Sequence, residues 1–206
     1  GDWQLLPFLW LAGRYRLRAV NRWKMFDNLR RSLVAPMSLA LLLLTLAGEF
    51  LSPWAALSLV LAAFSAGPLL GALAGLSPGR PDVARVRFYR QALNDLARAL
   101  WGGVWHLVQL QQQALMALDA TARALYRIVI SQRHLLQWTT AAAAQAQART
   151  RFVALLRLHW TEPVLALCLL AGLWAIATPW PALSTLLCLL WALAPVATWW
   201  ASRPPP

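Results

Sequence analysis

Acidic residues are scarce in this sequence, and their scarcity excludes several kinds of catalytic site. The 206 residues include 7 Asp and Glu against 19 Lys and Arg, for a formal net charge of +12. No two carboxylates have a spacing suited to paired acid and base chemistry, and the sequence has neither a glycine-rich phosphate loop nor an internal repeat. A complete hydrolase or nucleotide-sugar site is therefore not expected within this chain.

Potential metal ligands are equally few. The 2 cysteines, Cys168 and Cys188, lie within apolar runs without a Cys-x-x-Cys spacing, so we expect them to be small packing residues. The 3 histidines, His106, His134 and His159, are isolated from one another along helical patterns. The sequence therefore predicts no metal site and no cofactor bound by this segment.

Apolar residues are abundant, at 60% of the chain, and they gather in runs that contain no Lys or Arg. Four such runs each approach the roughly 20 residues needed to cross a bilayer core. They are residues 33–51, 54–76, 160–178 and 182–201. Ser52-Pro53 and Pro179-Trp180-Pro181 separate them in pairs, because proline stops a helix. The sequence thus predicts an all-α polytopic membrane protein with four spans in two tight transmembrane helical hairpins.

Polar and small residues within the runs have two interpretations each. We expect Glu49, near the end of the first run, to reach the headgroup region, and the alternative is a buried ligand for a hydroxylated substrate. Gly67, Gly71 and Gly75 recur every four residues in the second run. This stripe favours close helix packing over a pore.

The distribution of basic residues predicts the topology. Residues 1–32 contain seven Lys or Arg against two acids, and residues 77–162 contain eleven against four, while neither hairpin tip has any. By the positive-inside rule, both termini and the central segment are expected in the cytoplasm and the tips outside. The pI of about 11.6 then reflects topology and contact with anionic lipid, and nucleic-acid binding is not expected.

The segments outside the runs are predicted to be helical. Residues 14–31 combine cations with apolar residues every third position, typical of a helix lying in the headgroup plane. Its expected lipid contacts are Arg22, Trp23, Lys24, Arg30 and Arg31; a sugar path bordered by its aromatic rings is the alternative. Residues 85–150 have the periodicity of two or three cytoplasmic amphipathic helices, whose Ala-rich ends suit packing against a partner domain.

The two ends of the sequence have the composition of internal segments. The chain opens on Gly1 without an initiator Met or a signal peptide, and it closes on the Pro-rich residues 202–206, which have the composition of a linker. We therefore expect a segment of a longer protein.

Three stretches together resemble a known family. They are Gly1-Asp-Trp-Gln-Leu-Leu-Pro7, Arg22-Trp-Lys-Met-Phe-Asp-Asn-Leu-Arg-Arg-Ser-Leu-Val34, and Leu118-Asp-Ala-Thr-Ala-Arg-Ala-Leu-Tyr126 with Ser131-Gln-Arg-His-Leu-Leu-Gln-Trp-Thr139. They resemble the membrane region of the bacterial cyclic β-1,2-glucan synthases, inner-membrane proteins in which a processive glycosyltransferase domain precedes a glycoside-phosphorylase-like domain. The resemblance implies a parent enzyme that uses UDP-glucose with a divalent cation. Its catalytic aspartates would lie upstream, so this segment alone should be inactive.

The same resemblance implies a position near the acceptor sugar. Gly1-Asp2-Trp3-Gln4 is similar to the tail of the Gln-x-x-Arg-Trp box that contacts the acceptor in related processive synthases, although the Gln, Arg and Trp of the box are missing here. Arg22-Trp23 is not that box, because Ala19 stands where its Gln would be. Trp3 and Gln4 are therefore the predicted acceptor-side residues, and Asp2 could equally cap the following helix.

These inferences divide the chain into five parts. They are an acceptor-side or interfacial segment (1–32), hairpin 1 (33–76), cytoplasmic helices (77–159), hairpin 2 (160–201) and a Pro-rich linker (202–206). The predicted function is the transmembrane part of a glucan synthase, which anchors the catalytic domain and lines part of the glucan path. The expected partners are the bilayer, the two flanking domains and the glucan. The alternative is a non-enzymatic membrane scaffold or transporter fragment, although transport would favour more charge within the spans.

Overall fold

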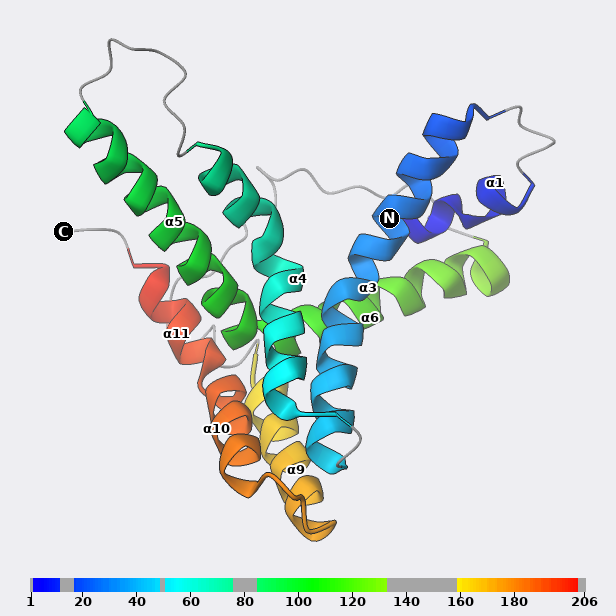
Figure 1. Ribbon diagram of the computed structural model, residues 1–206. Helices are drawn as coiled ribbons and strands as arrows, with labels where there is room; N and C mark the ends of the chain where they lie inside the picture. Colours follow the sequence, from blue (N-terminus) through cyan, green and yellow to red (C-terminus); the bar gives the residue numbers. More distant parts are fainter. Residues whose placement is uncertain (1, 12–16, 49–50, 76–84, 133–158, 204–206) are drawn as a thin grey trace.

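The computed structural model describes residues 2–11, 17–48, 51–75, 85–132 and 159–203, and these contain helices and turns but no strand. The all-α prediction is therefore confirmed for this part of the chain (Figure 1). The elements are η1 (Asp2–Leu5), α1 (Leu6–Trp10), α3 (Ala19–Ala47), α4 (Pro53–Ala74), α5 (Arg85–Val108), α6 (Leu110–Tyr126), η2 (Arg127–Ser131), α9 (Thr161–Ala175), α10 (Pro181–Ala192) and α11 (Ala194–Ala201).

Two helices are long and apolar enough to cross a membrane, α3 with 29 residues and α4 with 22. The helices α10 and α11 meet the same criterion only as a pair, bent by 46°. Pro195 accounts for the break between them, because it lacks the N–H that would continue the helical hydrogen bonds. The apolar helix α9 has 15 residues and is shorter than a span. The structure thus supports two or three spans, and four spans remain a prediction.

The first span does not begin where the sequence predicted. A separate interfacial helix ending near residue 31 was expected, followed by a span from residue 33. Instead, α3 runs without interruption through this boundary, with a basic N-terminal half and an apolar C-terminal half. No turn residue separates the halves, and Pro36 is accommodated inside the helix. The basic half therefore continues the axis of the apolar half, and this corrects the expectation of a separate helix in the headgroup plane.

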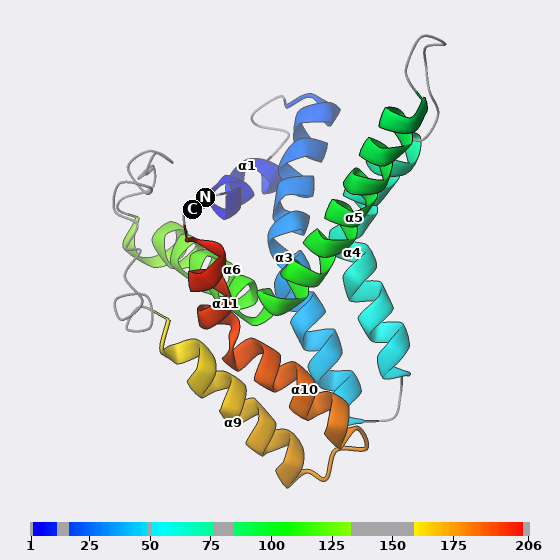
Figure 2. The same ribbon diagram turned by 90° about the vertical axis from the view of Figure 1, so that its left-hand side faces the viewer.

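The helices pair differently from two tight hairpins. Helix α9 packs against α10 as expected, but α4 packs along α5, while α6 crosses α3 (Figure 1). The view from the side also shows α9 beside α10 and α4 beside α5 (Figure 2). Helices α3 and α4 are close near the turn that joins them and diverge away from it (Figure 1). Both hairpin turns lie at one end of the bundle, opposite the basic halves of α3 and α5, which agrees with the charge argument for topology.

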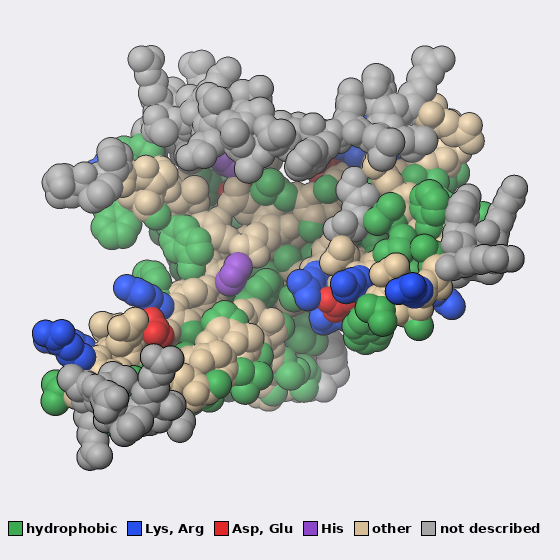
Figure 3. All heavy atoms as spheres, turned by 90° about the horizontal axis from the view of Figure 1, so that it is seen from above, with side chains coloured by type: hydrophobic (Ala, Val, Ile, Leu, Met, Phe, Trp, Pro, Cys, Tyr) green, Lys and Arg blue, Asp and Glu red, His purple; other side chains and the backbone are tan. Residues whose placement is uncertain are grey.

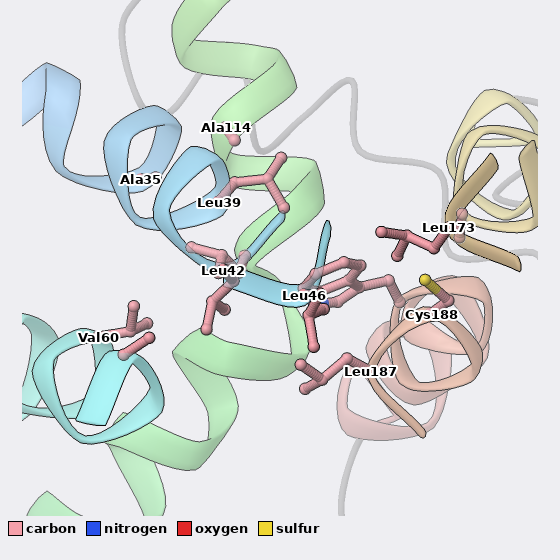
Figure 4. Packing of buried hydrophobic residues seen from close by; sticks show 13 residues of the cluster. Ala35, Leu39, Leu42, Leu46, Val60, Ala114, Leu173, Leu187 and Cys188 are labelled. Atoms are coloured by element: carbon pink, nitrogen blue, oxygen red, sulfur yellow. The ribbon is translucent and has the colours of Figure 1, made fainter. Parts of the chain in front are cut away.

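A buried apolar cluster joins the two hairpins to α6. Leu42 and Leu46 of α3 lie between Val60 of α4 and the pair Leu187 and Cys188 of α10 (Figure 4). Other members are Ala35, Leu39, Ala56, Leu110, Ala114, Ala166, Leu173 and Trp191. The Trp191 indole N–H donates to the carbonyl of Leu107, 3.1 Å away. Cys188 thus has the packing role expected from the sequence, whereas Cys168 is exposed on the described surface.

The closest approach of α4 and α5 occurs at Gly103. A Cβ added at Gly103 would overlap the Ser65 hydroxyl oxygen and lie 3.3 Å from the Ser65 Cβ. By contrast, a Cβ at Gly67 or Gly71 would meet no described atom within 4 Å, and one at Gly75 would meet only backbone oxygens of its own helix. Within the described chain, close packing of this pair therefore depends on Gly103. A packing role of the other three glycines stays a prediction.

The two hairpin turns are joined by a buried hydroxyl. Thr178 Oγ1 donates to the carbonyl of Leu46 at 2.5 Å and also accepts from the backbone N–H of Trp180. Leu46 lies in the last turn of α3, where carbonyls have no partner within the helix. The Thr178 hydroxyl therefore satisfies one of these carbonyls across 132 residues of sequence.

Thr178→Val should loosen the two turns. Valine keeps the shape of the side chain and leaves the Leu46 carbonyl unpaired. We therefore expect the free energy of unfolding to fall by about 1–3 kcal/mol. Hydrogen exchange of the peptides around residues 46 and 178 measures the effect. Thr185→Val is the matched control, because the Thr185 hydroxyl bonds only the Pro181 carbonyl of its own helix. Similar exchange in both variants would contradict a link between the turns.

Candidate functional site

A groove lies between the N-terminal segment and α3, at the place where the predicted acceptor-side residues meet the predicted lipid-facing residues. It has a volume of about 640 Å³. We call it the N-terminal groove; its lining residues are Trp3, Leu6, Leu9, Trp10, Phe26, Leu29, Arg30 and Leu33. Pro7 near the start of α1 presets a helical backbone there. The short helices η1 and α1 thus form one wall and α3 forms the other.

Trp3 fixes the first wall to the second. Its indole Nε1 donates to Ser32 Oγ at 2.8 Å, and Ser32 Oγ in turn donates to the Leu29 carbonyl at 2.7 Å. Both bonds are partly buried, so they orient the Trp3 ring across the groove. Because η1 also contacts α6, the Trp3 segment lies at the meeting point of α3 and α6. Gln4 is half-buried beside Trp3 in the same segment.

Charged residues border the groove on α3. Arg30 donates from Nε and Nη2 to Asp27 Oδ1, at 3.1 and 2.7 Å, and Arg31 contacts Asp27 Oδ2 at 2.7 Å. Asp27 lies in the basic half of α3, before the apolar run, and the hydrogen bond from Arg30 lowers its pKa below the usual value. The carboxylate thereby holds two guanidinium groups beside the groove.

The other predicted lipid-facing residues lie on the same half of α3. Arg22, Trp23 and Lys24 are exposed, and the Trp23 ring lies 6.3 Å from that of Phe26 at the groove. Figure 3 shows Lys and Arg side chains gathered over α3 and over α5 at this end of the molecule. The structure therefore brings the predicted acceptor-side and lipid-facing residues to one region.

A second polar site, which we call the polar junction, joins α6 to α9 and α11. Its members are Gln109, Gln111, Gln112, His159, Glu162 and Thr198. Gln109 donates to Thr198 Oγ1 at 2.7 Å, and Gln111 donates to the Glu162 carbonyl at 2.9 Å. His159 Nδ1 lies 2.5 Å from Glu162 Oε1 and 3.2 Å from the Gln112 amide nitrogen. These contacts hold the second hairpin against α6.

The polar junction can accept hydrogen bonds that the protein does not donate. Gln109 Oε1, Gln111 Oε1 and Glu162 Oε2 are buried and have no protein partner among the described residues. All three are acceptors, which suits bridging water. Nowhere in the described ranges do three His, Cys, Asp or Glu side chains come together as metal ligands. The junction therefore suits a structural role more than metal chemistry.

Sequence reasoning missed the polar junction. In the sequence, His106 and His159 are isolated from one another, and the run Gln109–Gln113 predicted no site. In the structure, the Gln113 amide lies 3.1 Å from His106 Nδ1, and the His106 ring stacks on Phe64 at 4.8 Å. The sequence did contain a signal for this site, because four of the five residues from 109 to 113 are glutamines on an otherwise apolar helix. Glu49 and His134 lie outside the described residues.

Comparison with known proteins supports the resemblance found in the sequence. No protein-family model matches the chain. It is similar to the cyclic beta-(1,2)-glucan synthase NdvB of Rhizobium meliloti (strain 1021), with 33% identity over 207 residues. The similarity covers 98% of this chain and 7% of that protein, so the chain spans a small part of the curated relative. The predicted resemblance to this family is confirmed for the segment.

Proposed function

We propose that this chain, similar along nearly its whole length to one segment of a cyclic β-(1,2)-glucan synthase, is the membrane region of a processive inner-membrane glycosyltransferase that makes cyclic β-1,2-glucan. The observation that carries the proposal is the extent of this similarity. Two helices of membrane-crossing length support it, because they can anchor a catalytic domain. The donor UDP-glucose and its divalent cation would bind a domain upstream of this segment.

Within that enzyme, the N-terminal segment would position the acceptor end of the glucan. Trp3 and Gln4 lie in η1, which contacts both α3 and α6. The Trp3 side chain is hydrogen-bonded to Ser32 of α3, so a movement of α3 would also move the Trp3 segment. The membrane helices would thus set the place where the growing chain leaves the catalytic domain. Both termini would be cytoplasmic, because the basic halves of α3 and α5 lie opposite the hairpin turns.

Glucose transfer by membranes that contain the full-length parent protein tests this proposal. We expect incorporation of glucose from UDP-glucose into β-1,2-linked polymer. Trp3→Ala should reduce polymer formation by about tenfold and leave UDP-glucose binding unchanged, because the proposal gives Trp3 a role at the acceptor and none at the donor. Trp101→Ala is the matched control, since Trp101 is an exposed tryptophan of α5 that contributes nothing to the groove.

Two results would contradict the proposal. If the intact parent transfers no glucose, the non-enzymatic scaffold becomes the better interpretation of the chain. If Trp3→Ala reduces sugar-nucleotide binding as much as polymer formation, the acceptor-side role of Trp3 is wrong.

A further inference from the structure

The N-terminal groove has a lining that suits a hydrocarbon chain better than a sugar. Five of its eight lining residues, Leu6, Leu9, Phe26, Leu29 and Leu33, offer only carbon to an occupant. The Trp3 indole N–H is already bonded to Ser32. A glucan would have to bury its hydroxyl groups against this surface, and a buried hydroxyl without a partner costs about 1–3 kcal/mol. An acyl chain has no hydrogen-bonding groups, so its burial there carries no such cost.

The position of the groove matches the border between hydrocarbon and headgroups. It lies on the basic half of α3, and the same helix continues into the apolar run. Trp10 at the groove is 84% exposed, and Trp23 one turn from Phe26 is 65% exposed. Exposed tryptophans are typical of the membrane interface, where the ring meets lipid and the N–H meets water. An occupant of the groove would therefore come from the bilayer.

The charge beside the groove selects an anionic headgroup. From residue 17 to residue 32, the described chain has five Lys and Arg against Asp27. Arg30 and Arg31 are 59% and 71% exposed although both contact Asp27. A guanidinium carries five N–H donors, so each can also bind a phosphate oxygen.

We propose that the N-terminal groove binds an anionic phospholipid, with one acyl chain along Leu6, Leu9 and Leu33 and the phosphate on Arg30 and Arg31. The lipid would fill the space between η1–α1 and α3, and would thereby hold the Trp3 segment against the membrane helix. This inference requires the membrane position given above but not glucan synthesis. It can therefore hold or fail independently of the activity of the parent.

Photolabelling of the full-length protein in phosphatidylcholine nanodiscs tests the site. The probe is phosphatidylglycerol with a diazirine on one acyl chain, and peptide mass spectrometry locates the label. We expect labelling of peptides 2–11 and 26–33 to be about tenfold higher than with the matched phosphatidylcholine probe. Leu9→Trp should obstruct the acyl-chain path beside Leu6 and Leu33 and reduce this labelling about fivefold, with Leu93→Trp on the exposed surface of α5 as its control.

The charge variants separate headgroup binding from folding. Arg30→Gln with Arg31→Gln should bring phosphatidylglycerol labelling down to the phosphatidylcholine level, and these exposed residues can change without loss of helix content. Arg87→Gln with Arg90→Gln on α5 is the control and should have no effect. Equal labelling by both probes, unchanged by Leu9→Trp, would show ordinary surrounding lipid and overturn the proposal. Loss of labelling on addition of a β-1,2-linked oligosaccharide would instead assign the groove to the glucan.

Discussion

Gly103→Leu should separate α5 from α4. The added side chain would enter the space of Ser65, whose Cβ lies 3.3 Å from the site of a Cβ at residue 103. Both positions are buried within regular helices, so the leucine can be accommodated only if the helices move apart. Overpacking of this kind typically costs about 1–3 kcal/mol, and we expect the upper part of the range because two backbones must shift. In the α4 and α5 peptides, amide hydrogen exchange should then be about tenfold to a hundredfold faster.

Gly102→Leu provides the matched control on the adjacent residue. A Cβ at Gly102 meets no described atom within 4 Å, and leucine favours a helix over glycine by about 0.8 kcal/mol. Exchange should therefore be unchanged or slower in this variant. If Gly102→Leu and Gly103→Leu speed exchange equally, α4 and α5 do not pack through this face.

The example of Gly103 shows what the sequence could and could not predict. Apolar runs and prolines predicted most of the helices, because hydrophobicity and helix termination are properties of neighbouring residues. They did not predict that α5 covers α4, since a periodic pattern shows which side of a helix is buried but not which helix buries it. A glycine stripe is visible in the sequence, whereas a single glycine opposite a serine is visible only in the structure.

The candidate site shows the same limit. The resemblance placed Trp3 and Gln4 near an acceptor, and the composition placed Arg30 and Arg31 near lipid. That these two sets border one groove depends on the packing of η1 and α1 against α3, which no local pattern predicts. The polar junction was missed because its partners are distant: Gln109 meets a residue 89 positions away, and Gln111 meets one 51 positions away.

His159→Ala should detach the start of α9 from α6. The Glu162 side chain is 7% exposed and that of His159 is 22% exposed, and their nearest atoms lie 2.5 Å apart. Removal of His159 would leave a buried carboxylate with one oxygen that already lacks a protein partner. Breaking a buried pair costs about 3–5 kcal/mol, and the partial exposure of His159 reduces this to about 2 kcal/mol. Hydrogen exchange of peptide 161–175 measures the loss.

A double-mutant cycle isolates the interaction from the loss of the imidazole itself. Glu162→Gln keeps the shape of the side chain and removes its charge, so His159→Ala should cost less in this background. We expect a coupling energy of at least about 1 kcal/mol, within the range for residues of one buried network. Asp119 and Arg123 on α6 form the control pair, with atoms 2.8 Å apart and side chains 57% and 71% exposed. Their coupling should stay near 0.3–0.5 kcal/mol.

Salt distinguishes the two pairs further. Screening weakens an exposed ion pair but acts much less on a buried one, so added salt should reduce only the coupling between Asp119 and Arg123. A coupling of His159 to Glu162 that is equally small and equally sensitive to salt would mean that water surrounds the pair. In that case the start of α9 would not be buried against α6, and the hydrogen bond from Gln111 to the Glu162 carbonyl could not hold the second hairpin in place.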